Sequence, residues 1–278
     1  LKQFVSRLPA PLAKAAGVAE PLDMEVQLPG PGEVSVSGAI DRGVSWALEF
    51  TAPAQRGQPR WRLARGELRS GGPRASLPGT PGLAIAGSFA SLRFEDWVPA
   101  RGSTTAAGAP PASGDLLNRI DLKAERFAIL GRTFPATRIS ARRTGGEWQV
   151  AVRGPTAEGT ITVPAGPGDE APIVLDMDRL WLGDQAGNGT NGADAGDADP
   201  RKFPAVRATV RDFVLKDMQL GRLTAEVVQR GDGIVVEPLT MQGPDFRVTG
   251  DAAWVLEQDD PGRQRSELRL ALTSTDIA

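Results

Sequence analysis

The stretch 44–51, VSWALEFT, decides the fold class because apolar and polar side chains alternate along it. A period of two residues places Val44, Trp46, Leu48 and Phe50 on one face of a β-strand and the polar side chains on the other. With 33 Gly and 23 Pro, the chain disfavours long helices. The alternation recurs at 138–142, 148–153, 159–163, 206–211, 223–227, 246–248 and 268–273. The sequence therefore predicts a mainly β protein with few short helices.

Turn and linker signals divide the chain into β-rich segments. Glycine clusters at 144–146 and 230–233 predict hairpins and hence an antiparallel β-meander. The small, polar stretches 101–115 and 184–200 lack periodicity, which predicts a flexible linker and a disordered Asp/Gly-rich loop. We expect one sheet to continue across the β-rich segments 1–100, 116–183 and 201–278.

A weak internal repeat and an ambiguous N-terminus complete this organisation. Leu130–Gly131–Arg132 matches Leu220–Gly221–Arg222, and alternating residues follow both copies. Such a repeat predicts β-meander units that stack into an elongated sheet. Before Pro9, the spacing of Leu1, Phe4 and Leu8 suits either a short helix or a loop packed on the sheet.

The composition removes several classes of chemistry. The chain has no Cys, His or Tyr, which excludes thiolate nucleophiles, imidazole bases and Cys/His metal sites. Its 32 basic and 34 acidic residues do not form the strongly basic footprint of a nucleic-acid-binding protein. We predict no catalytic residue, no cofactor, no metal site and no nucleic-acid partner.

Three motifs match known functional sites in part, but each also has a simpler structural explanation. The run 187–192, GNGTNG, fits G-x-G-x-x-G but lacks the strand before it and the helix after it that a dinucleotide site needs. The acidic residues within 184–199 lack the spacing of a calcium loop. Asp176 and Asp178 could form the carboxylate pair of a glycosidase, although the outer face of a half-buried strand also needs polar residues.

The pattern leaves one architectural question open, because a sheet with an apolar face needs a second layer. A closed sandwich would make that face ordinary core, whereas an open trough would expose an apolar surface that fits acyl chains. Composition alone favours ordinary core. Val210→Asp separates the two: it should unfold a sandwich, but should only obstruct the acyl path of a trough.

A set of short Gly- and Pro-rich elements occurs in a defined order along the chain. The longest is 77–87, LPGTPGLAIAG, followed by 92–97, LRFEDW. The others are 8–14 (LPAPLAK), 17–22, Phe127 with Leu130–Gly131, 146–148 (GEW), 159–164 (GTITVP), 175–176 (LD), 180–182 (LWL) and 199–200 (DP) before 203–205 (FPA). Over nearly the whole chain, this order resembles the YhdP family of AsmA-like bacterial envelope proteins.

The resemblance implies a segment of a long periplasmic protein whose parent is anchored in the inner membrane of a Gram-negative bacterium. It implies an extended, strongly curved antiparallel sheet that forms an open hydrophobic groove. Phospholipid would pass passively along it between inner and outer membrane, supporting the outer-membrane permeability barrier. Membrane contact would come through other parts of the parent, and other envelope proteins would be further partners.

The apolar faces supply the candidate groove lining. The candidates are Trp148, Val150, Val152, Ile161, Val163, Val206, Ala208, Val210, Leu223, Ala225, Val227, Leu268 and Leu270. The alternative function is a non-catalytic structural or assembly β-sandwich module of the cell envelope.

Overall fold

A computed structural model describes residues 21–40, 43–52, 61–94, 116–129, 131–164, 171–183, 199–257 and 263–274. These residues are almost entirely β-strand, and the helix η3 (Pro200–Lys202) is a single turn. The prediction of a mainly β fold with few short helices is confirmed. Contacts divide the chain into two compact units, residues 1–130 with 138–143, and residues 131–137 with 144–278.

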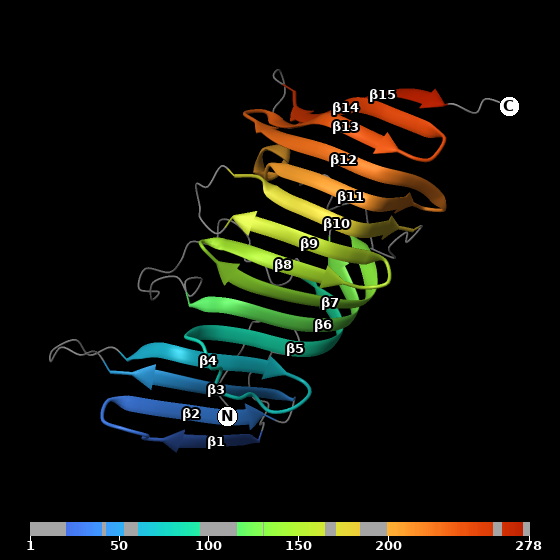
Figure 1. Cartoon of the computed structure of the whole chain (residues 1–278). Helices are drawn as coiled ribbons and strands as arrows, with labels where there is room; N and C mark the ends of the chain where they lie inside the picture. Colours follow the sequence, from blue (N-terminus) through green and yellow to red (C-terminus); the bar gives the residue numbers. More distant parts are fainter. Residues whose placement is uncertain are drawn as a thin grey trace. The chain divides into compact units, whose positions relative to one another are not determined.

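The first unit holds a sheet whose strands follow one another in sequence order (Figure 1). Its strands are β1 (Leu22–Gln27), β2 (Glu33–Ile40), β3 (Val44–Thr51), β4 (Arg62–Ser70), β5 (Gly82–Arg93) and β6 (Leu117–Ile129). Strand β7 (Arg132–Thr144) supplies residues to both units. Because β1 pairs only with β2 among the described strands, this sheet is open at β1.

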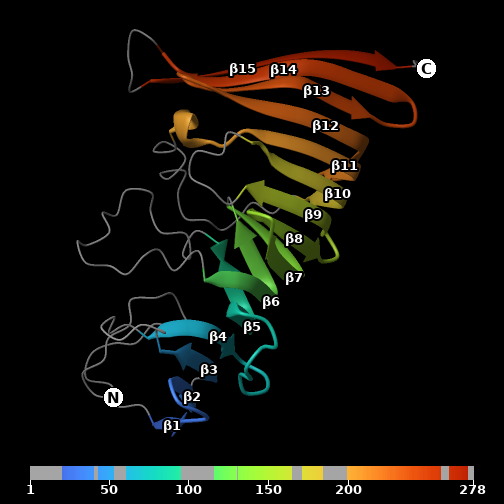
Figure 2. The same cartoon turned by 60° about the vertical axis from the view of Figure 1, so that its left-hand side comes forward.

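The second unit also keeps its strands in sequence order and is open at β15. Its strands are β8 (Glu147–Arg153), β9 (Ala157–Pro164), β10 (Ile173–Leu182), β11 (Val206–Leu215), β12 (Met218–Arg230), β13 (Gly233–Gln242), β14 (Phe246–Leu256) and β15 (Gln264–Ser274). Figure 2 shows the long strands β12–β15 bending along their length, with η3 at the end where β11 begins. The predicted open, curved sheet is thus observed.

Parallel pairs interrupt the antiparallel pattern where the connections are long. Strand β5 runs parallel to β4 and to β6, and β10 runs parallel to β11. The paired strands are separated in the sequence by residues 71–81, 94–116 and 183–205. By contrast, only residues 145–146 separate β7 from β8. For two consecutive strands to pair in parallel, the chain must first cross back to the end of the sheet at which the first strand began. A tight turn is too short for this crossover. The parallel pairs thus occur where many residues separate consecutive strands.

Strand β3 has the two faces that its alternation predicts. Cross-strand pairing aligns Trp46 with Gly38 of β2 and with Leu68 of β4. A Cβ atom on Gly38 would lie 2.6 Å from the Trp46 ring, so this ring covers the glycine. The residue without a side chain thus makes room for the largest one on the apolar face.

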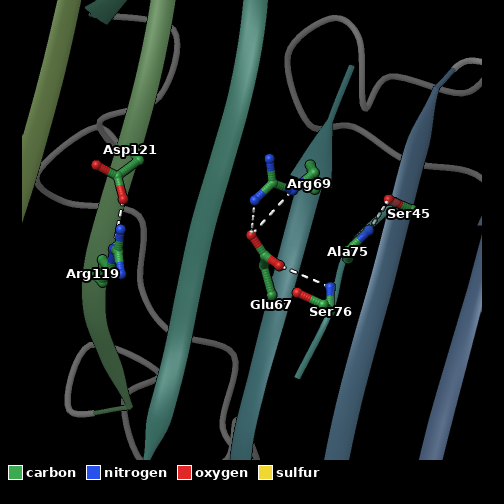
Figure 3. Close-up of polar contacts among 7 residues, drawn as sticks. All are labelled: Ser45, Glu67, Arg69, Ala75, Ser76, Arg119 and Asp121. Carbon is green, nitrogen blue, oxygen red and sulfur yellow. Dashed lines mark hydrogen bonds and ion pairs between the residues drawn. The ribbon is translucent and has the colours of Figure 1, made fainter. Parts of the chain in front are cut away.

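The crossover connection 71–81 covers the opposite, polar face of β3 and β4. The backbone N–H of Ala75 donates to Ser45 Oγ (2.8 Å), and that of Ser76 donates to Glu67 Oε2 (2.9 Å) (Figure 3). Arg69 also donates to the Glu67 carboxylate. Ser45 and Glu67 are consequently buried with their hydrogen bonds satisfied. In the first unit, a described connection therefore covers the polar face.

A prediction arises from an ion pair on the same polar face. Arg65 Nε and Nη2 donate to the two Glu49 carboxylate oxygens at 2.9 and 2.8 Å, and this hydrogen bonding lowers the pKa of Glu49 below its ordinary 4.5. A lowered carboxyl pKa adds stability above pH 4.5 that is lost as the pH falls through the folded-state pKa. We expect the difference in melting temperature between the native chain and Glu49→Gln to shrink as the pH falls below 4.5.

Thermal unfolding across this pH range tests the expectation, with Arg65→Gln as the matched variant. Removing the donor should abolish the same pH-dependent increment. A difference that stays constant through the acid range would show that the pair does not govern this dependence.

Other predictions fall outside the described residues. These are the N-terminal helix or loop (1–20), the linker 101–115, and residues 184–198 of the Asp/Gly-rich loop, including the run 187–192. The division into segments 1–100, 116–183 and 201–278 stays a prediction.

Candidate functional site

Cross-strand pairing aligns the apolar side chains of β8–β15 into three rows that run across the strands. The first row consists of Val152, Gly159, Met177, Val210, Leu223, Met241, Val248 and Leu272. The second consists of Val150, Ile161, Leu175, Ala208, Ala225, Leu239, Gly250 and Leu270. The third contains Trp148 and Val163 and, from β10 onward, Ile173, Val206, Val227, Val236, Ala252 and Leu268. Apart from the indole N–H of Trp148, these side chains carry no hydrogen-bonding group, so the rows form a continuous apolar face.

Every predicted lining residue lies in one of these rows. The rows also include residues that the prediction left out, among them Leu239 and Met241 of β13. Their period-two pattern is broken by a register shift between Val236 and Leu239. An irregularity of this kind moves side chains to the other face, so simple alternation cannot place the residues beyond it.

Exposure changes greatly along the apolar face. On edge strand β15, Leu268 is 62%, Leu270 51% and Leu272 68% exposed. At β10 and β11, Met177 is 4% and Val210 1% exposed. The first row is therefore open to solvent at β15 and closed at Met177 and Val210, whereas Leu175 and Ala208 in the second row are partly buried.

The closed section is a packed cluster formed by Ala157, Met177, Val210 and Phe213. Partly buried side chains from neighbouring strands surround it, including Phe134, Leu223 and Met241. Register shifts lie beside the cluster in β10, after Met177, and in β11, after Val210. Bulges bend a strand and increase its twist, which brings side chains on the concave side together. The burial of Val210 follows from this local curvature.

The first unit has an open apolar face of its own. A row across its strands consists of Met24, Gly38, Trp46, Leu68, Ile85 and Ile120. Met24 and Val26 on β1 are each 54% exposed. Among the described residues of the first unit, the apolar face is thus open at edge strand β1.

The opposite face of the second unit is ionic. Arg211 of β11 pairs with Asp176 (Nη2 to Oδ1, 3.2 Å) and with Asp178 of β10. Arg207 and Glu226 bridge β11 and β12 at 3.1 Å, and the Trp181 indole N–H donates to Asp212. These exposed pairs keep the face soluble and add little stability.

Asp176 and Asp178, the predicted carboxylate pair, both bind one arginine across the strand interface. Within the described ranges, no group of three or more acidic side chains is arranged to hold a metal ion. No helix among those residues has the length and hydropathy to cross a membrane.

An apolar face backed by a charged face defines the class: an open β-sheet protein. The chain belongs to the YhdP protein family, whose model matches residues 1–278. This is a family of bacterial envelope proteins. No curated protein and no solved structure matches the chain.

Proposed function

We propose that this chain is a segment of a periplasm-spanning AsmA-like protein that carries phospholipid passively between the inner and outer membranes. Transport along the apolar face would support the outer-membrane permeability barrier of a Gram-negative bacterium, with the parent anchored in the inner membrane. The observation that carries the proposal is the continuity of the three rows across β8–β15. Membership of an envelope family supports the location.

The physical basis is the transfer of acyl chains from water to an apolar surface. Each buried methylene contributes about 0.8 kcal/mol, so a few contacted methylenes retain a lipid. Because the side chains along each row are nearly all apolar, an acyl chain that moves from one strand to the next exchanges similar contacts. The headgroup stays in water beyond the rows, where Gln229 and Ser266 introduce polar side chains on this face.

The proposal assigns no enzymatic step to this chain. Acyl chains are the partner, and membrane contact falls to other parts of the parent or to other envelope proteins. The ionic pairs on the opposite face hold the carboxylates that a hydrolase would use. Replacing Asp176 and Asp178 together should therefore leave transport unchanged.

One observation favours a second candidate, a structural or assembly module of the envelope. The cluster around Val210 is buried from solvent, as the side chains of an ordinary protein core are. A module of this kind would use the same face for cohesion alone and would bind no lipid.

Leu270→Asp tests lipid binding on the open part of the face, and Ala271→Asp is its matched control. Both residues are exposed on β15, but they lie on opposite faces. We expect Leu270→Asp to reduce the phospholipid that copurifies with the chain several-fold, because acyl chains avoid a carboxylate. Ala271→Asp should retain it. Mass spectrometry of extracted lipid makes the measurement, and equal retention in both variants would remove this face from the path.

A further inference from the structure

The apolar rows do not offer an acyl chain equal access along their length. Leu270 and Val210 lie on the same face, yet their exposed fractions are 51% and 1%. A methylene chain reaching β11 meets side chains already in contact with one another. Binding there requires that a protein side chain move first.

Met177 is the member of the cluster best suited to move. Its thioether chain is unbranched and flexible, whereas Val210 is β-branched and Phe213 is a rigid ring. The side chain rests on Gly159 of β9: a Cβ on this glycine would lie 3.0 Å from Met177 Sδ and 2.5 Å from Met177 Cα. Gly159 leaves the space beneath the thioether free of a side chain.

We propose that Met177, Val210 and Phe213 form a constriction in the acyl path, and that displacement of Met177 opens it. The proposal rests on the proposed function and specifies how transport along that face is controlled. The open strand β15 holds acyl chains in the resting state, and the buried positions Met177, Val210 and Phe213 admit them only in a minor open state. The constriction therefore sets the rate at which lipid crosses the second unit.

Photolabelling tests where acyl chains bind. The whole chain is incubated with vesicles of phosphatidylethanolamine that carries a diazirine in one acyl chain, irradiated, digested and mapped by mass spectrometry. Because minor open states are populated at about 10% or less, we expect about tenfold less label at 206–213 than at 268–272. Equal labelling of both stretches would overturn the constriction and leave lipid binding intact. Absence of label from both would overturn the proposed function itself.

Met177→Ala tests the moving part, and Met177→Leu is its matched control. Once circular dichroism has established that each variant is folded, Met177→Ala should raise labelling at 206–213 several-fold, because it shortens the side chain that closes the path. Met177→Leu conserves the apolar volume and should leave the pattern unchanged. A folded Met177→Ala variant with the native pattern would overturn the role of Met177. The comparison of labelling at 206–213 and 268–272 in the native chain tests the constriction without either variant.

Discussion

Val210→Asp is expected to abolish cooperative folding of the second unit. Val210 is 1% exposed and packs among Ala157, Met177 and Phe213, with no cationic side chain in the cluster. A carboxylate at this position would lose its hydration without a partner, at a cost of several kcal/mol. Since domains are stable by about 5–15 kcal/mol, this single change removes a large part of the total. Urea unfolding followed by circular dichroism measures the effect.

Two control variants show whether the loss of stability in Val210→Asp comes from burying a charge. Val210→Ala measures the effect of lost side-chain volume, and Leu270→Asp measures the effect of a charge at an exposed position. Val210→Ala removes two methyl groups and should cost about 2 kcal/mol. Leu270→Asp places the same carboxylate in the adjacent row at an exposed position, and it should change stability by less than about 1 kcal/mol. Because Val210 is buried in a local cluster of an open sheet, unfolding of Val210→Asp does not by itself indicate a sandwich. Native-like unfolding of this variant would contradict the closed cluster.

Gly221→Ala is expected to produce the second-largest loss of stability. Gly221 has a φ of +71°, and a Cβ there would lie 2.2 Å from the carbonyl oxygen of Gln242 in β13. The obstacle is backbone in a paired strand, so no side-chain rotation relieves it. Strain at positive φ together with this overlap should cost about 3 kcal/mol or more. Thermal unfolding would show it as a lowered melting temperature.

Gly131→Ala is an internal control for the same substitution. Gly131 occupies the matching position of the Leu-Gly-Arg repeat and has a φ of +70°, but no atom lies within 4 Å of a Cβ placed there. Its replacement should cost only the conformational term, about 1–2 kcal/mol. Similar losses at Gly131 and Gly221 would show that steric overlap with β13 does not matter.

The shared glycine conformation shows how far local sequence predicts local structure. Two copies of one tripeptide adopt nearly the same positive φ because glycine alone tolerates it without strain. Their surroundings differ, since Gly221 is crowded by the neighbouring strand and Gly131 is not. Tolerance to substitution therefore depends on pairing that the tripeptide does not encode.

The direction of strand pairing is likewise predicted only in part by the local sequence. Glycines at 145–146 and 231–233 predict hairpins, and the strands that they join are antiparallel in β12–β13. The polar stretch 184–200 predicts a linker, but only the fold shows that β10 and β11, the strands before and after it in the sequence, pair in parallel. A long connection permits a parallel return without requiring one, so local composition does not decide the direction.

By itself, the sequence determined the β class and the face on which most apolar side chains lie, because alternation is a local property of an extended chain. Only the tertiary structure distinguished Val210 from Leu270, two residues with the same pattern on the same face. The burial of Val210 arises because bulges beside it curve β10 and β11 until side chains from several strands meet. Leu270 stays exposed because β15 is an edge strand that pairs on one side only. Such differences in exposure depend on contacts between residues far apart in the chain. The alternation of neighbouring residues carries no information about these contacts.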